Sequence, residues 1–463
     1  MPDIAFLGAA GTVTGSRYLV TSRGGRNGDE RALVDCGMYQ GLKELRQRNW
    51  EPPPFDASDL PFVILTHAHI DHSGLLPRLV RQGFKGAIIS TPATHELAKL
   101  LLMDAARLQE EDAAFLNRKR LTKHAPALPL FDAGDASMAL ERFTVRPYGE
   151  WTDLSDVMSF RFHNAGHLLG SAMVGMRVQE NGGATTILFS GDLGRFEMPL
   201  NPDPDPPPAA DCLVLESTYG DRAHRADSLY DQVVRVVKET MARRGVLVIP
   251  SFAVGRAQQI IYVLNVLMEK GRLPLLPIHL DSPMAVEATR IYARHPGEQE
   301  SRGELTARNL ICHRTVEESK ALNGFEGPGI IISSSGMLAG GRILHHLKRL
   351  LPDPRHTIAL VGYQAAGTRG RAMQEGEKTI RIHGEDVPVR ARVEDLCGFS
   401  GHADAGEMLR WLSLATRPPG TVFLTHGEPA AASALAERLR SERRLTVRIP
   451  RLGEVATVER ART

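Results

Sequence analysis

The stretch LTHAHIDHSGLLP, residues 65–77, decides the fold because it gathers metal-binding side chain types within six positions. These side chains follow directly after the apolar run PFVIL and belong to His67, His69, Asp71 and His72. Imidazole and carboxylate groups are natural ligands of Zn²⁺ and similar ions, and a metal needs several of them at one point. On an extended loop, the first two histidines can point the same way, whereas the aspartate and the third histidine turn toward a second point. A lone histidine would indicate little, but this density predicts metal binding.

Further ligands are expected at the ends of other strands, because one loop rarely closes a metal site. The segment RFHNAGHLLGSA offers His167 beside a glycine-containing turn, and His163 is a competing candidate that lies inside a predicted strand. Other apolar strands end at Asp35 in RALVDCG, at Asp192 in TTILFSGD and at His426 in TVFLTHGE. Strand ends meet at a sheet edge, where such side chains converge. Together with the first loop, they predict a two-metal centre.

Composition and length describe a globular protein of a reducing compartment. At 463 residues, with 42% hydrophobic and 24% charged residues, the chain is expected to hold two domains, or one domain with a large insert. The four cysteines, none in a CxxC pair, are Cys36, Cys212, Cys312 and Cys397. That spacing argues against a disulfide framework and a cysteine zinc site, so we expect a cytoplasmic location.

Targeting signals and charge narrow the class of protein further. The segment MPDIAFLGAAGTVTGSRYLV predicts a strand, a glycine-rich turn and another strand, not a signal peptide. No apolar run approaches the roughly 18 residues of a membrane span, so no membrane partner is expected. The formal net charge is +2, and a nucleic-acid-binding protein of this charge must concentrate its basic residues locally.

The chain shows two kinds of secondary-structure pattern. Up to about residue 200, short apolar strands alternate with turns, and TPATHELAKLLLMDAARLQEEDAAF (91–115) has helical periodicity. The proline cluster NPDPDPPPAAD (201–211) cannot continue a helix or a central strand and predicts a linker. Beyond it, strands such as GVLVIPSF and GIIISSSGM each precede a helical segment. Strands that alternate with helices predict a parallel α/β sheet.

Small polar and basic residues gather at the carboxyl ends of these later strands, where parallel sheets bind ligands and helix N-termini accept phosphate. They are Ser251, Arg256, Ser282, Ser333, Ser334, Ser335, Gly336 and Arg342. The group predicts phosphate contacts, although each residue alone is better explained as an ordinary cap or turn.

Several motifs, read in order, cover nearly the whole chain. They are HAHIDH (67–72), AGHLLGS (165–171), SGD (190–192), LVLESTYGDR (213–222), GFSGHAD (398–404) and LTHGE (424–428). The HxHxDH signature alone would establish only the metallo-β-lactamase superfamily, which also includes thioesterases, lactamases and redox enzymes. The full set resembles the β-CASP ribonucleases, among them the endonuclease subunit of pre-mRNA 3′-end processing and ribonuclease J.

The resemblance implies an α/β fold, a metallo-β-lactamase αββα sandwich with an inserted parallel α/β domain, the β-CASP domain. Residues 1–210 would form the first part of the sandwich, 211–388 the insert, and 389–463 the C-terminal return. The return would carry His402 and His426 to the metal edge, so that distant motifs meet in space.

The resemblance also implies roles for the ligand-type residues. The ligands of the first metal would be His67, His69 and His167. Those of the second would be Asp71, His72 and His426. Asp192 would bridge the two ions, and Asp35 would orient a ligand or the bridging water from behind. The ions would be two Zn²⁺, with Mn²⁺ as the alternative.

The same resemblance implies a phosphodiester hydrolysis. Two ions about 3.5–4 Å apart activate a bridging water and brace the phosphoryl oxygens during in-line attack. Asp71 would also accept the proton of the water. His402, supported by Glu216, would stabilise the charged transition state or protonate the leaving ribose oxygen. The alternative for these two residues is an ordinary capping pair.

Two considerations favour single-stranded RNA as the substrate. Superfamily members that act on DNA generally lack a histidine at the last motif position, where this chain has His426. The insert would also close over the site as a cleft, which admits a single strand better than a duplex. Arg256 and Arg342 are the preferred phosphate contacts, through their guanidinium groups. Residues 333–335 and the turn at Ser400 would help to bind a terminal phosphate.

Three other functions stay open at this point. A hydrolase of small esters or thioesters would use the same metal core, but its reaction would require neither Glu216 and His402 nor the insert. A non-catalytic RNA-processing scaffold is disfavoured because every ligand position is filled, and a DNA nuclease is the remaining alternative. The sequence does not decide between endonuclease and 5′-exonuclease action, and the resemblance leaves a homodimer open.

Overall fold

The computed structural model describes residues 1–25, 28–121, 126–180, 183–224, 228–362, 364 and 367–461. The chain packs into two compact units. The first comprises Met1–Phe196, Asp203–Ala223 and His402–Thr463, and the second comprises Glu197–Pro202 and His224–Gly401. The domain boundaries expected from the sequence, at 210/211 and 388/389, stay predictions.

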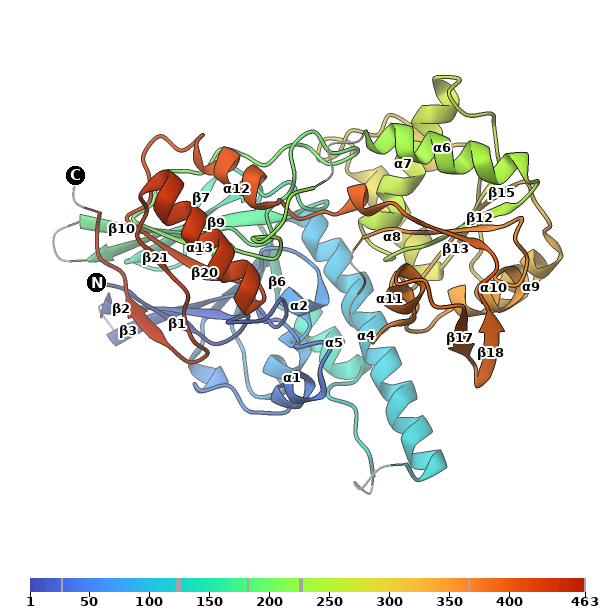
Figure 1. Cartoon of the computed structure of the whole chain (residues 1–463). Coiled ribbons are helices and arrows are strands. Elements are labelled where there is room, and N and C mark those ends of the chain that lie inside the picture. The colour runs from blue at the N-terminus through green and yellow to red at the C-terminus, as the bar shows by residue number, and fades with distance from the viewer. Residues whose placement is uncertain are drawn as a thin grey trace. The chain divides into compact units, whose positions relative to one another are not determined.

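Two seven-stranded sheets build the first unit (Figure 1). The first sheet has the spatial order β22 (Val455–Thr457), β1 (Asp3–Phe6), β2 (Tyr18–Gly25), β3 (Gly28–Val34), β4 (Phe62–Ile64), β5 (Ala87–Ser90) and β6 (Phe143–Val145). The second has the order β21 (Val447–Arg448), β20 (Thr421–Thr425), β11 (Cys212–Glu216), β10 (Gly183–Phe189), β9 (Ala172–Glu180), β8 (Met158–Asn164) and β7 (Trp151–Asp153). In each sheet one half is parallel, so neighbouring strands end at the same edge.

The core of the first unit lies between these sheets. Alternate residues of β8 turn inward, so that Met158, Phe160 and Phe162 are buried. Phe6 of the first sheet faces Phe423 of the second, with ring centroids 5.0 Å apart. Burying a side chain of this size contributes about 1.5–3 kcal/mol. The interface therefore fixes the two sheets against each other, and with them the strand ends that carry the predicted ligands.

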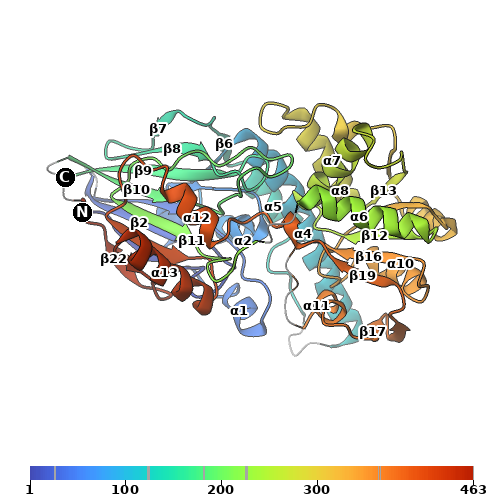
Figure 2. The ribbon, with the colours of Figure 1, turned by 45° about the horizontal axis from the view of Figure 1, so that its top comes forward.

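The helices of the first unit lie outside its two sheets (Figure 1). They are α1 (Lys43–Arg48), α2 (Ile70–Ser73), α3 (Leu76–Arg81), α4 (Pro92–Lys119), α5 (Ala133–Leu140), α12 (Ala405–Leu412) and α13 (Pro429–Arg443), with a short 3₁₀ helix at Ala57–Asp59. Helices α12 and α13 pack on the second sheet through Trp411 and Leu435, which are fully buried (Figures 1 and 2). The long helix α4 contacts β6 of the first sheet. The result is the αββα sandwich that the sequence predicts.

The helix expected over 91–115 is α4, and its first turn shows why it begins there. The Thr91 hydroxyl accepts a hydrogen bond from the Thr94 N–H, and Pro92 occupies the first helical position. Among the helices of the described ranges, none combines the length and the apolar character needed to cross a bilayer.

The second unit is built on a six-stranded sheet whose strands are all parallel. Its spatial order is β14 (Leu310–Cys312), β13 (Ile278–Asp281), β15 (Gly329–Ser333), β12 (Val246–Pro250), β16 (Thr357–Leu360) and β19 (Arg392–Asp395), beside a hairpin of β17 (Thr379–Ile382) and β18 (Glu385–Pro388). Its helices are α6 (Leu229–Ala242), α7 (Arg256–Glu269), α8 (Pro283–Arg294), α9 (Val316–Ala321), α10 (Ile343–Leu350) and α11 (Arg369–Gln374), with 3₁₀ turns at Glu304–Thr306, Leu322–Gly324 and Cys397–Phe399. The predicted parallel α/β arrangement is confirmed.

Candidate metal centre

The loop that follows β4 carries the first ligand-type residues. His67 and His69 lie on the loop itself, whereas Asp71 and His72 belong to the single turn of α2. We expected all of them on an extended loop; the helical turn is what rotates the second pair away from the first. The loop is held from behind, because the Cys36 N–H donates to the His72 carbonyl at 2.8 Å.

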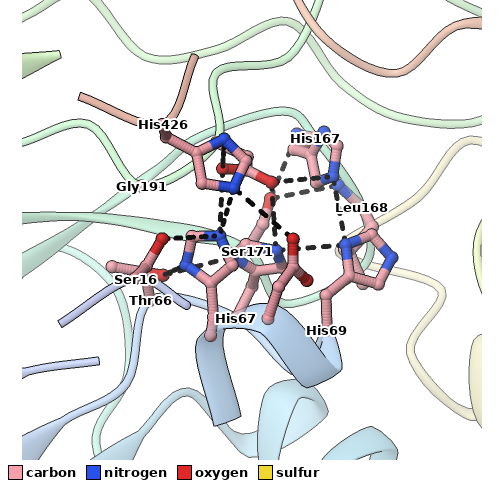
Figure 3. A network of polar contacts seen from close by, with 12 residues as sticks. Ser16, Thr66, His67, His69, His167, Leu168, Ser171, Gly191 and His426 are labelled. Atoms are coloured by element: carbon pink, nitrogen blue, oxygen red, sulfur yellow. Dashed lines mark hydrogen bonds and ion pairs between the residues drawn. The ribbon is translucent and has the colours of Figure 1, made fainter. Parts of the chain in front are cut away.

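The first group of side chains converges from three segments of the unit, which follow β4, β8 and β10. His67 Nε2 lies 3.1 Å from His69 Nδ1, and His167 Nε2 lies 3.4 Å from the same atom. His167 stands on the turn after β8, where Ser171 Oγ accepts from the His167 and Leu168 N–H groups, both at 3.1 Å (Figure 3). One ligand atom from each of these histidines and one from Asp192 all lie within 4.8 Å of one another. His163, the competing candidate, lies within β8 and belongs to no such group among the described residues.

A second group lies beside the first and consists of Asp71, His72 and His426. His426 Nε2 lies 3.3 Å from His72 Nε2 and 3.4 Å from Asp71 Oδ2. His426 follows β20 directly and has a positive φ of 47°, which turns its ring back toward the strand end. Figure 3 shows its ring opposite His67, across the centre of the cluster.

Asp192 divides its two carboxylate oxygens between the groups. Its Oδ2 lies 3.4 Å from His67 Nε2 and 3.6 Å from His167 Nε2. Its Oδ1 lies 3.1 Å from His72 Nε2 and 3.6 Å from His426 Nδ1. The residue is 2% exposed, and Oδ1 has no hydrogen-bond partner among the described residues. A buried carboxylate oxygen without a donor is expected where a cation takes the place of the donor.

Protonation states in the first group suit metal binding. Burial and the nearby His72 lower the pKa of His67. In the same way, burial and His67 lower the pKa of His69 to about 3. Burial and His402 lower the pKa of His167. Ligands of a metal ion must be neutral imidazoles or ionised carboxylates. All three histidines are therefore neutral at pH 7, as a metal site requires.

The carboxylates are the anionic part of the donor set. Burial alone raises the pKa of Asp71 and Asp192, but the surrounding histidines outweigh it and hold both carboxyl groups ionised. His72 is the exception among the histidines, because Asp192 and Asp35 outweigh burial and raise its pKa. Ionised carboxylates buried so close together are stabilised only by positive charge between them, which a proton on His72 or a metal ion supplies. The donor set thus fits two adjacent divalent cations.

Asp35 supports the centre from behind, together with a residue that sequence reasoning missed. His72 Nδ1 donates to Asp35 Oδ2 at 2.7 Å, and the Thr66 hydroxyl donates to the same oxygen at 2.8 Å. With its proton directed to Asp35, the hydroxyl oxygen of Thr66 accepts from His67 Nδ1 at 3.1 Å. Both histidines therefore turn Nε2 toward Asp192. The only signal in the sequence was a threonine directly before the HxHxDH motif.

Thr218 is a second supporting residue that sequence reasoning missed. Its hydroxyl lies 3.1 Å from the His426 carbonyl oxygen, to which it donates, and 3.1 Å from His426 Nδ1, from which it accepts. This fixes the tautomer of His426 with the Nε2 lone pair facing Asp71 and His72. Thr218 lies two residues after Glu216, inside a motif that was singled out for the glutamate alone.

Glu216 and His402 form a hydrogen-bonded pair beside the first group. His402 Nδ1 lies 3.1 and 3.2 Å from the two carboxylate oxygens of Glu216, and the Leu193 N–H donates to one of them at 2.6 Å. Burial lowers the pKa of His402, but the charge and hydrogen bond of Glu216 outweigh it and raise that pKa to about 9. The His402 ring centroid lies 4.6 Å from that of His167. The structure thus brings a cationic imidazole next to the candidate metal ligands.

The predicted phosphate contacts all lie in the second unit, at or near the carboxyl ends of its parallel strands. Ser251 and Ser400 are buried, Ser334 Oγ donates to Ser282 Oγ at 3.2 Å, and Ser335 Oγ donates to the Gly340 carbonyl. Gly336 lies so near Phe252 that a Cβ would meet its backbone nitrogen at 3.1 Å.

The two arginines preferred as phosphate contacts already have partners in the second unit. Arg256 donates to Gln259 Oε1 at 2.5 Å. The guanidinium of Arg342 donates to Asp281 Oδ1 at 2.8 Å and to the carbonyl groups of His313 and Arg314. A phosphate would have to share these donors, and the phosphate-binding roles stay predictions.

Comparison with known proteins agrees with this arrangement. Family models match for the metallo-β-lactamase superfamily over residues 11–235, for the Beta-Casp domain over 257–373 and for a Zn-dependent metallo-hydrolase RNA specificity domain over 386–450. The chain is 42% identical over 460 residues to Ribonuclease TTHA0252 of Thermus thermophilus, a match covering 96% of this chain and 98% of that one. It is 33% identical over 445 residues to the Transcription termination factor FttA of Methanosarcina mazei, covering 90% and 67%.

Among solved structures, the metallo-β-lactamase fold protein YhfI of Bacillus subtilis is 16% identical, with a TM-score of 0.26 over 47% of this chain and 72% of that one. The family rests on the sequence relatives and models instead. The chain belongs to the β-CASP family of metallo-hydrolases with the metallo-β-lactamase fold, which includes ribonucleases.

Proposed function

We propose that this protein is a zinc-dependent ribonuclease that hydrolyses phosphodiester bonds of single-stranded RNA with two metal ions, Mn²⁺ being the alternative metal. The observation that carries the proposal is Asp192, whose two oxygens face one histidine group each. A nuclease of the same family, Ribonuclease TTHA0252, aligns with nearly the whole chain. The cytoplasmic location and a homodimer stay predictions.

In this proposal His67, His69 and His167 hold the first ion, and Asp71, His72 and His426 hold the second, with Asp192 between them. Bound there, the ions would supply an activated water and neutralise the phosphoryl oxygens. The carboxylate of Asp71 is ionised at pH 7 and can accept the proton of that water.

His402 supplies a positive charge to the reaction, whereas Asp71 supplies a negative one. Because Glu216 keeps it protonated at pH 7, its imidazolium can stabilise negative charge on the phosphoryl group or donate a proton to the leaving ribose oxygen. Glu216 acts through His402, because its carboxylate holds the ring by Nδ1.

A cleavage assay tests the proposal. The full chain, with its metal content determined, is incubated with 5′-labelled single-stranded RNA, matched DNA and a small ester, each with and without chelator. We expect chelator-sensitive cleavage of RNA alone, and the product ladder separates endonuclease from 5′-exonuclease action. Ester hydrolysis without RNA cleavage by protein that holds two metals would refute the proposal in favour of a small-ester hydrolase.

A further inference from the structure

An exposed arm leaves the first unit next to the candidate metal loop. This α1 arm, residues 36–50, begins where the Cys36 N–H donates to the His72 carbonyl and the Met38 N–H donates to the Ile70 carbonyl at 3.0 Å. Helix α1 lies beside α2 in both views of the ribbon (Figures 1 and 2). The arm therefore starts on the backbone of the metal loop itself.

The arm is closed and held in one conformation by Asn49. The Tyr39 N–H donates to Asn49 Oδ1 and Asn49 Nδ2 donates to the Tyr39 carbonyl, both at 2.8 Å. Asn49 is 5% exposed, so water does not compete for these bonds. The two ends of the arm are thus tied together, and α1 is presented on a fixed base.

One face of the arm combines basic, amide and aromatic side chains. Lys43, Arg46, Gln47 and Trp50 have the spacing i, i+3, i+4 and i+7, and the helical turn extends to Trp50 because its N–H donates to the Gln47 carbonyl at 3.0 Å. Residues three and four apart share a helix face, with Cβ atoms about 5–6 Å from each other. All four side chains are exposed, and α1 buries none of its residues.

The indole of Trp50 is held in place yet accessible. The Arg78 guanidinium lies 5.6 Å from its ring centroid, and Arg78 Nη2 donates to the Trp50 carbonyl at 2.6 Å. Trp50 is nevertheless 51% exposed, although tryptophan side chains are highly buried on average. A preorganised exposed aromatic ring is suited to stack on a planar partner.

The positive charges of this face have no partners of their own. Among the described residues, no ion pair or hydrogen bond involves the side chains of Lys43 or Arg46. The acidic residues Glu44, within the arm, and Glu51, directly after it, fall outside the i, i+3, i+4, i+7 set. Unpaired cations beside an exposed aromatic ring match the chemistry of a single nucleic-acid strand, which offers phosphates and unstacked bases.

We propose that the α1 arm is a binding surface for single-stranded RNA outside the metal centre, on which Trp50 stacks a base and Lys43 and Arg46 contact phosphates. The inference rests on the proposed function and extends it, because it gives the substrate a contact on the same unit as the metal ligands.

Equilibrium binding tests the inference without cleavage. A fluorescein-labelled single-stranded oligoribonucleotide is titrated with the chelator-treated full chain, whose retained fold is verified by circular dichroism, over a series of salt concentrations. Trp50→Ala is expected to weaken binding about tenfold, whereas Trp50→Phe keeps the affinity within about twofold because a ring remains. Lys43→Gln with Arg46→Gln is expected to reduce the slope of log K against log salt by about 1.4, or 0.7 for each lost contact.

Matched control variants remove a tryptophan ring or two positive charges at positions outside the α1 arm. Trp151 is 38% exposed and also lies against an arginine, Arg177, so Trp151→Ala should leave binding unchanged. Lys320→Gln with Lys378→Gln removes two exposed charges of the second unit. With metal present, the arm variants should raise KM while kcat and metal content stay unchanged.

The outcomes separate this inference from the proposed function. A parent chain that binds RNA, with arm variants of equal affinity and equal salt slope, would overturn the role of the arm and leave the proposed function intact. A parent chain that binds no single-stranded RNA would overturn both. Equal losses in Trp50→Ala and Trp50→Phe would assign the indole a structural role and refute stacking.

Discussion

At the scale of single residues, the hydroxyl group of Thr66 joins the two histidine groups through one carboxylate. It accepts from His67, a member of the first group, and donates to Asp35, which also accepts from His72 of the second. A rotation of either ring would cost a hydrogen bond in a buried site. The orientation of one histidine in each group therefore depends on the same threonine.

Replacing Thr66 by valine keeps the shape and removes the hydroxyl, so we expect a loss of metal affinity at both positions. Loss of a group that orients ligands typically lowers metal affinity about 10–100-fold. Isothermal titration of the apo protein with Zn²⁺ measures both binding steps. Thr66→Ser, which retains the hydroxyl, serves as the control, and a variant with one weakened and one normal step would contradict the shared role.

Asp192 is predicted to matter more than any other single carboxylate of the site, because each of its oxygens serves a different group. Asp192→Ala should remove most RNA hydrolysis and lower the metal content, while the fold stays largely intact. Activity, elemental analysis and circular dichroism are measured on the same sample. Since loss of a buried anion can destabilise its cationic surroundings, Asp192→Asn is the isosteric control. Full activity in the alanine variant would exclude a bridging role.

The candidate site could be predicted from the sequence as far as its chemically distinctive residues, and no further. His67, His69 and Asp192 stand out because imidazole and carboxylate groups gather in one loop and recur at the ends of several apolar strands. Thr66 and Thr218 do not stand out, since a threonine is equally common at a strand end for its β-branched shape. Their roles depend on which ring nitrogen faces which hydroxyl, and that is a property of the folded structure.

At the scale of elements, Asp281 ties the end of β13 to two helices of the second unit. Its carboxylate accepts from Arg342 at the start of α10 at 2.8 Å, from His346 within α10 at 2.7 Å and from Ser319 of α9 at 2.7 Å. Its side chain has no exposed surface. Burial raises the pKa of Asp281, but these hydrogen bonds and charges outweigh it and lower that pKa below its usual value.

Because the folded-state pKa is lowered, the stabilisation by Asp281 is complete above the unfolded carboxyl value of about 3.9 and is lost as the pH falls through the folded-state pKa. Asp281→Asn should lower the free energy of unfolding at pH 7 by about 3–5 kcal/mol, the typical effect of breaking a buried pair. The difference from the parent chain should shrink below pH 4.

Urea unfolding between pH 7 and pH 3, followed by hydrogen exchange in α10, measures this effect. Asp386→Asn, which removes an exposed carboxylate of the same unit, should change stability by less than about 0.5 kcal/mol. A loss that stays constant down to pH 3 would show that the charge of Asp281 is not the cause.

The elements were predictable where local pattern and packing agree. The apolar runs of the second unit became parallel strands, and α4 begins at its threonine cap as its pattern indicates. The turn of α2 was not predictable, because IDHS has no apolar periodicity. It forms where its backbone meets the loop after β3, through hydrogen bonds such as that from the Met38 N–H to the Ile70 carbonyl.

At the scale of the whole molecule, the two histidine groups of the candidate metal centre and the Asp192 between them all belong to the first unit. Zn²⁺ should therefore stabilise the first unit selectively. A ligand present at 100 times its Kd stabilises the form that binds it by about 2.7 kcal/mol. Differential scanning calorimetry with Zn²⁺ and with chelator should shift the Tm of one transition only. Equal shifts of all transitions would mean that the two units unfold together.

The order of the ligands along the chain has a consequence for protein synthesis. Asp192 and His426 are 234 residues apart, since 426 minus 192 is 234, which takes about 12–47 s to translate at 5–20 residues per second. Until β20 emerges from the ribosome, the nascent chain lacks the last histidine of the second group. If His426 holds the second metal ion as proposed, the catalytic site of the nascent chain is incomplete until β20 and His426 have been made, and the messenger RNA being translated is not exposed to an active nuclease before then.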